Sequence, residues 1–135
     1  RFPAKPPDTV RILPAPDPAL AVRLAPPEAE HLVLTYSHHF DLQICHALLQ
    51  HGFARAGVIG SKTKWFRFRK RLLDLGHSNM LITQIRCPIG DPALGKQPQA
   101  IAVGVVSQLL SQQYMRCLSR SNTPVGELHR KAVSP

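Results

Sequence analysis

The sequence predicts an α/β fold in which helices flank a parallel sheet. Two short β-prone runs, His31–Tyr36 and Ala54–Ile59, are each followed by a segment whose apolar residues have helical spacing. Strands that alternate with helices indicate βαβ units, which place successive strands parallel. The length of 135 residues also suits one domain with a single core.

The first elements are short. Thr9–Leu13 reads as a strand, and Asp17 before Pro18 is typical of an N-cap followed by proline in the first helical turn. His31–Tyr36 is a continuous β-prone run, so we expect a strand that is buried on both faces.

A helix is predicted after each of these two strands. The first covers about His39–His51 and ends at Gly52, a suitable C-cap. The second covers Lys62–Leu75 and ends at Gly76. The expected core stripe of this second helix is Trp65, Phe68, Leu72 and Leu75, and the residues expected on its other sides are Lys64, Arg67, Arg71 and Asp74.

The C-terminal third is less regular. Ser78–Ile85 is ambiguous, and prolines and glycines predict a loop over residues 87–98. A long helix is expected from Gln99 to about Leu118. We therefore predict a partial domain over residues 1–118 and a flexible, polar, basic tail over residues 119–135.

The formal net charge of +9 favours anionic partners such as phosphates, nucleotides, nucleic acids or acidic proteins. The three cysteines form no Cys-x-x-Cys pair, which suits a reducing cytoplasm and argues against a zinc knuckle. The seven histidines share no ligand spacing, so no metal site is predicted. No apolar run approaches the ~20 residues of a membrane helix, so no membrane association is expected.

Three segments are expected to meet at the carboxyl ends of the strands, where open parallel sheets bind their ligands. They are Thr35–Asp41, Gly60–Lys64 and the loop of residues 87–98. We therefore place the candidate site at this edge.

Gly60 and Ser61 stand where a strand passes into a basic helix. Glycine permits a close approach of a ligand, serine caps the helix, and the N–H groups of the helix start suit a phosphate. Lys62 and Lys64 would add positive charge. The alternative is that Gly-Ser only caps a helix whose bases are solvated.

His38 and Asp41 stand three residues apart at a helix start, where they could form an acid–base or metal pair. Asp41 equally suits the helix dipole. Cys87 could accept sulfur or contact a soft metal centre, or be a small buried thiol, and Cys45 is expected in the core. The sequence has neither a Gly-x-Ser-x-Gly nucleophile elbow nor a Walker loop.

Taken in order, these segments resemble the xanthine dehydrogenase accessory proteins of the XdhC/CoxI type, which are chaperones for molybdenum cofactor insertion. Thr35–Asp41 is similar to the family's Thr-His-Asp-His-x-x-Asp, with Tyr36 and Ser37 in place of His and Asp. Gly57–Lys64 is similar to Gly-Leu-Ile-Gly-Ser with its Arg/Lys-x-Lys. The family's Pro-Ile-Gly is also present, followed by Pro and Ile-Ala; these matches are Pro88-Ile89-Gly90, Pro98 and Ile101-Ala102.

The resemblance implies a Rossmann-like domain that is incomplete, because the first βα unit with its Gly-rich turn is missing from this chain. It also implies a chaperone, not an enzyme, that binds molybdopterin as cargo and assists its sulfuration and insertion. The implied partners are a molybdenum hydroxylase apoenzyme and a cysteine desulfurase. The cofactor contacts it implies are Thr35, His38, Asp41, Gly60, Ser61, Lys62, Lys64, Pro88, Ile89 and Gly90, with Cys87 as a sulfur contact.

Two other function classes are considered. A nucleotide-dependent oxidoreductase would need a Gly-rich turn and an acidic ribose partner, and both are missing. A nucleic-acid-binding module would use the helix of Lys62–Arg71 and bind with steep salt dependence, a partner that we do not favour. A half-sheet would also leave an apolar edge, so we expect a homodimer or association with the missing half of the domain.

Overall fold

The structure is a computed structural model that describes residues 5–121. It divides into two compact units, Arg1–Ile89 and Gly90–Pro135, which are described separately. None of the helices in the described range is both long and apolar enough to cross a membrane.

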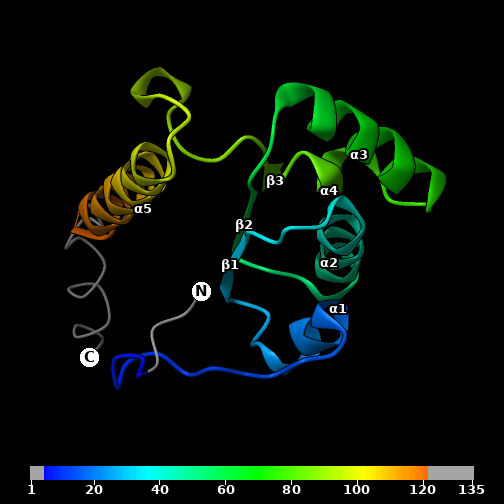
Figure 1. The fold of residues 1–135 in the computed structure, drawn as a ribbon, viewed down its shortest axis with the longest axis horizontal. Coiled ribbons are helices and arrows are strands. Elements are labelled where there is room, and N and C mark those ends of the chain that lie inside the picture. Colours follow the sequence, from blue (N-terminus) through cyan, green and yellow to red (C-terminus); the bar gives the residue numbers. More distant parts are fainter. Residues whose placement is uncertain (1–4, 122–135) are drawn as a thin grey trace, which may run out of the picture. The chain divides into compact units, whose positions relative to one another are not determined.

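The first unit contains a parallel sheet of three strands in the order β1-β2-β3 (Figure 1). These strands are β1 (Glu30–Val33), β2 (Arg55–Val58) and β3 (Ile85–Arg86). Val33 of β1 is in register with Val58 of β2. The predicted α/β class, with a partial Rossmann-like sheet and flanking helices, is therefore confirmed.

The helices of this unit lie together beside the sheet (Figure 1). They are α1 (Pro18–Ala21), which continues into the 3-10 helix η1 (Val22–Leu24), then α2 (His38–His51), α3 (Lys62–Asp74) and α4 (Asn79–Ile82). Burial of apolar side chains between these helices and the sheet forms the core. Its buried residues are Val22, Val33, Cys45, Leu48, Ala56, Val58, Phe68, Leu72, Ile82 and Ile85.

Local capping signals set the ends of the two long helices of this unit. Ser37 caps α2 by accepting from Phe40 N, and Ser61 caps α3 by accepting from Lys64 N. Gly52 ends α2 with a φ of 93°, a left-handed conformation that glycine adopts without steric cost. The predicted helices are thus found within one residue of their expected bounds.

The second unit contains the 3-10 helix η2 (Pro92–Leu94) and the long helix α5 (Pro98–Ser121). The backbone at Gly90 and Asp91 passes directly over α5, because a Cβ on Gly104 would lie 2.7 Å from Asp91 N. The predicted long helix is confirmed, and it runs three residues past its expected end. Residues 122–135 of the predicted basic tail lie outside the described residues.

Three sequence predictions are wrong. Thr9–Leu13 is not a strand, because no described strand pairs with it and backbone hydrogen bonds to a neighbour are what make a strand stable. β1 is not buried on both faces: Val33 faces the helices, whereas Leu32 is exposed. Leu75 is also exposed, because α3 ends at Asp74 and Leu75 leaves the helical stripe.

Candidate functional site

The ends of β1 and β2 bring two of the predicted segments together. Thr35–Asp41 follows β1 and enters α2, while Gly60–Lys64 follows β2 and enters α3. The two strands are parallel neighbours, so both segments leave the same edge of the sheet. A direct contact between Asp41 and Lys64 joins them.

Asp41 is the centre of this contact. Its side chain is fully buried, which is rare for a carboxylate unless its oxygens are paired. Thr35 donates to Asp41 Oδ1 from both its backbone N (3.2 Å) and its Oγ1 (2.6 Å). Lys64 Nζ donates to Asp41 Oδ2 at 2.5 Å. Both oxygens of the carboxylate are therefore satisfied within the protein.

Lys64 points inward, contrary to its expected place outside the core stripe. Its side chain is only 8% exposed, and its Nζ donates a second hydrogen bond to the Ile59 carbonyl at 2.8 Å. The ammonium also lies 5.2 Å from the centroid of the Phe68 ring, within cation–π range. Lys64 thus ties α3 to Asp41 of α2 and to the backbone just after β2.

Gly60 makes room for the Lys64 side chain. Its φ is 156°, and a Cβ at this position would lie 2.6 Å from Lys64 Cδ. The close approach predicted at Gly60 is therefore made by an aliphatic part of Lys64.

The start of α3 keeps the features of the predicted anion site. Ser61, Lys62 and Thr63 are exposed, and among the described residues Ser61 Oγ accepts only from Lys64 N, at 3.1 Å. The first N–H groups of an α-helix have no partner inside the helix, and they carry the positive end of its dipole. The N–H groups and the charge of Lys62 can therefore meet an anion at this edge.

The third predicted segment is fixed against the middle strand as far as Ile89. The Cys87-Pro88 peptide bond is cis, and Ile89 N donates to Val58 O at 3.3 Å. Ile89 is buried over Gly57, where an added Cβ would lie 2.4 Å from Ile89 Cγ2. Gly90 belongs to the second unit, where its N–H donates to Gln108 Oε1.

Two thiols lie within the electrostatic influence of the Asp41–Lys64 pair. Burial, then the charge of Asp41, then Cys87, raise the pKa of Cys45 to about 12, against a smaller opposing effect of Lys64. Burial also raises the pKa of the half-buried Cys87; Lys64 lowers it, and Asp41 raises it. Both thiols are therefore protonated at neutral pH, the less nucleophilic form. Cys45 is in the core, as predicted.

His38 does not join Asp41 in the described contacts. Its side chain is exposed, and its ring meets that of Phe68 edge-on at a centroid distance of 6.4 Å. Within residues 5–121, no three His, Cys, Asp or Glu side chains are grouped closely enough to hold a metal ion.

Comparison with known proteins identifies the family. Residues 2–109 match the model of the XdhC Rossmann domain. The chain belongs to this family. The resemblance found in the sequence is thereby confirmed.

A solved structure from Bacillus halodurans, described as a xanthine dehydrogenase, is similar to this XdhC Rossmann domain. The sequence identity is 27% and the TM-score is 0.58. The match covers 82% of this chain and 32% of the other, so this chain spans about a third of that protein. A search of the curated proteins found no match.

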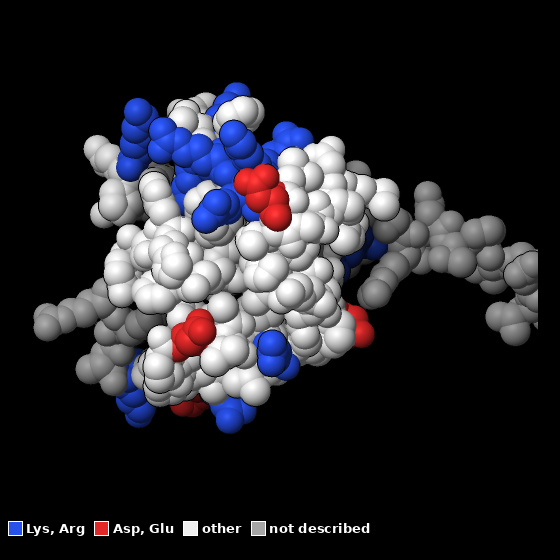
Figure 2. All heavy atoms as spheres, turned by 90° about the vertical axis from the view of Figure 1, so that its right-hand side faces the viewer, with Lys and Arg blue, Asp and Glu red and all other residues white. Residues whose placement is uncertain are grey.

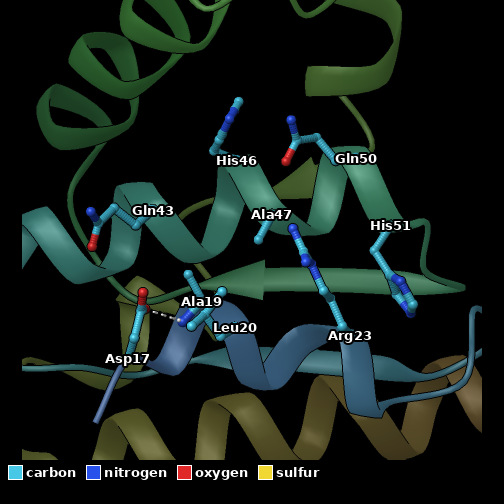
Figure 3. A pocket seen from close by; sticks show the side chains of 9 residues that line it. All are labelled: Asp17, Ala19, Leu20, Arg23, Gln43, His46, Ala47, Gln50 and His51. Atoms are coloured by element: carbon cyan, nitrogen blue, oxygen red, sulfur yellow. Dashed lines mark hydrogen bonds between the residues drawn. The ribbon is translucent and has the colours of Figure 1, made fainter. Parts of the chain in front are cut away.

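The XdhC Rossmann domain also has a hollow of about 620 Å³ that the sequence did not predict (Figure 3). Arg23 extends from η1 toward α2, whereas His46 projects from α2 away from Arg23, so the polar groups do not converge on one point (Figure 3). The hollow is lined by Asp17, Ala19, Leu20, Arg23, Gln43, His46, Ala47, Gln50 and His51.

His46 has a second role, because it pairs with His77. The distance from His46 Nδ1 to His77 Nε2 is 2.6 Å, which joins α2 to the turn between α3 and α4. Burial, and then the charge of His46, lower the pKa of His77. One proton can lie between these two nitrogens, donated by one ring and accepted by the other. A proton on each of the two nitrogens would make the rings repel.

Proposed function

We propose that this chain is the part of a molybdenum cofactor chaperone that holds the cofactor while a xanthine dehydrogenase-type hydroxylase is matured. The observation that carries the proposal is the family match over residues 2–109. The similarity to a protein described as a xanthine dehydrogenase supports the same assignment.

The cofactor would bind at the carboxyl ends of β1 and β2. Its terminal phosphate would lie at the start of α3, against the N–H groups after Ser61 and the ammonium of Lys62. The exposure of Ser61, Lys62 and Thr63 fits a phosphate of this kind. His38, exposed at the start of α2, would add a hydrogen bond from the neighbouring segment.

Asp41, Lys64 and Thr35 would act mainly by fixing the two loops. Their hydrogen-bonding groups are used within the protein, so the pair sets the distance between the starts of α2 and α3. Gly60 would keep the space for Lys64 open, while Pro88 and Ile89 would form the third wall. Direct contact of these residues with the cofactor stays a prediction.

The chemistry at molybdenum would belong to the cofactor and to a partner cysteine desulfurase, so the chain itself would not be an enzyme. Cys87 is the side chain proposed to face the sulfur of the cofactor. Its thiol is half-buried and protonated at neutral pH, which suits a hydrogen-bond donor better than a sulfur acceptor. The proposed setting is the cytoplasm.

Cofactor retention by the purified chain is the direct test. The chain is loaded anaerobically with molybdopterin, passed over a sizing column and assayed for molybdenum and absorbance. Lys62→Pro removes one N–H and one charge from the first helical position, where proline is tolerated and Ser61 is already extended. Lys62→Ala is the matched control that removes only the charge.

We expect wild type to retain cofactor at near one equivalent, Lys62→Ala to bind several-fold more weakly, and Lys62→Pro to bind at least tenfold more weakly. If folded wild type elutes without molybdenum, the cofactor proposal is wrong. If Lys62→Pro retains cofactor as well as wild type does, the phosphate does not lie at the start of α3.

A further inference from the structure

The outer side of α3 carries a combination of side chains that, Lys62 apart, the cofactor site does not use. Opposite its buried stripe, Phe66 is 72% exposed and Leu73 is 45% exposed, seven residues apart and therefore on one side of the helix. Lys62, Arg67 and Lys70 surround them, and all three are exposed. We call these five residues the α3 face. Lys and Arg side chains gather over α3 at the top of Figure 2.

Two features of the positive charge on the α3 face destabilise the helix itself. Lys62 lies in the first turn, at the positive end of the helix dipole, where a cation is unfavourable. Arg67 and Lys70 are three residues apart, a spacing at which like charges repel. Within residues 5–121, neither Lys62, Arg67 nor Lys70 forms an ion pair. An acidic partner would relieve this repulsion.

The exposed apolar side chains indicate what else that partner must offer. Phe66 and Leu73 have the i, i+7 spacing of anchors that bind an apolar groove. Met80 of α4 adds a third exposed apolar group, and α4 is held to α3 by Arg69, which donates to Asn79 Oδ1 at 2.8 Å. Aromatic residues, Met and Arg are the types enriched in protein interfaces.

These features favour a protein over a nucleic acid. A single-stranded nucleic acid would stack a nucleobase on Phe66 and place its phosphates against the Lys and Arg side chains. Leu73 and Met80, however, offer no flat ring for stacking. An apolar groove with Asp and Glu at its rim would use both the aliphatic groups and the charges. We propose that the α3 face docks such an acidic groove on the client hydroxylase. The identity of the client rests on the proposed function.

The test measures binding of the immobilised chain to the apo-hydroxylase, with salt raised from 50 to 300 mM. Phe66→Ala removes an anchor without changing charge, and Arg67→Glu with Lys70→Glu reverses the charge. Matched controls lie on η1, away from α3: Leu24→Ala, at 73% exposure nearly equal to Phe66, and Arg23→Glu. All substituted side chains are exposed, and circular dichroism verifies that each variant is folded.

We expect Phe66→Ala to weaken binding at least tenfold, as for an interface hot spot. The charge reversal should weaken binding at low salt and flatten its salt dependence, because screened surface charges contribute less at high salt. The two controls should bind as wild type does. Equal binding by Phe66→Ala, or no binding by wild type, overturns the proposal.

A 20-nucleotide oligothymidine is measured in parallel. If it binds wild type more tightly than the apo-hydroxylase does, and Phe66→Ala abolishes that binding, the face is a nucleic-acid surface and the proposal fails. Cofactor retention separates this inference from the proposed function. A chain that retains molybdopterin but does not bind the apo-hydroxylase refutes only the docking surface, whereas a chain that docks through α3 without retaining cofactor refutes only the cofactor site.

Discussion

Replacing Lys64 with Met removes the ammonium that neutralises the buried Asp41 carboxylate. Met has similar length and apolar bulk, so the change tests the charge more than the packing. The carboxylate keeps its two hydrogen bonds from Thr35 but loses its counter-ion, and the Ile59 carbonyl loses a donor. A carboxylate left unpaired in the interior is the main cost.

The size of the effect follows from the burial of both partners. Asp41 is fully buried and Lys64 nearly so, and removing one partner of a buried ion pair costs about 3–5 kcal/mol. Asp41→Asn should cost a similar amount, because it leaves the Lys64 ammonium without its anion. The double variant leaves neither charge, so it should lose at least about 2 kcal/mol less than the sum of the single variants.

Urea unfolding followed by fluorescence supplies the measurement. Trp65 is the only tryptophan of the chain, and it packs against the core one residue after Lys64. Lys62→Met on the exposed side of α3 is the matched control, with an expected change within about 0.5 kcal/mol. A loss below about 1 kcal/mol for Lys64→Met, or purely additive single and double variants, would refute the role given to this pair.

Other predictions concern the thiol, a glycine and a histidine. Because the pKa of Cys45 is raised from 9.0 to about 12, the free energy of unfolding of wild type should fall by about 1.4 kcal/mol between pH 8 and pH 10. Cys45→Val should not show this loss, and parallel pH profiles of the two proteins would contradict the prediction. Gly57→Ala should lower the free energy of unfolding in urea by about 1–3 kcal/mol, because its Cβ would overlap Ile89 Cγ2. In an Ile89→Ala background, the same substitution should cost less. The lowered pKa of His77 means that the unfolded chain binds more protons than the folded chain, so stability should fall as the pH drops below about 6.5. Thermal unfolding of His77→Gln should show a weaker decline. An equally steep decline would count against the His46–His77 pair.

The sequence predicted the long elements because their ends carry local signals. Ser61 and Gly76 bound α3 through capping chemistry that depends only on neighbouring residues. In contrast, α4 has four residues and β3 has two, too few for any periodicity. Thr9–Leu13 has the composition of a strand, but a strand also needs a hydrogen-bonded neighbour, which composition cannot supply.

The meeting of two of the three candidate segments was predicted, but the contacts between them were not. The rule that ligands collect at the carboxyl ends of parallel strands correctly brought Thr35–Asp41 beside Gly60–Lys64. Lys64 was placed outside the core stripe because lysine is seldom buried. Its spacing was the missed signal, since Lys64, Phe68 and Leu72 are four residues apart and share one side of α3.

Because the Lys64 amine is buried, the rate of its chemical modification reports on how often the folded protein opens at this place. Acylating reagents modify an unprotonated, accessible amine, and in the folded chain the ammonium of Lys64 is enclosed and bound to Asp41 and Ile59. Lys62 and Lys70 on the same helix are exposed and would be labelled at ordinary rates, so they serve as internal standards. The rate at which Lys64 acquires label therefore measures how often its contacts with Asp41 and Ile59 open. A cargo that bridges α2 and α3 should slow this labelling.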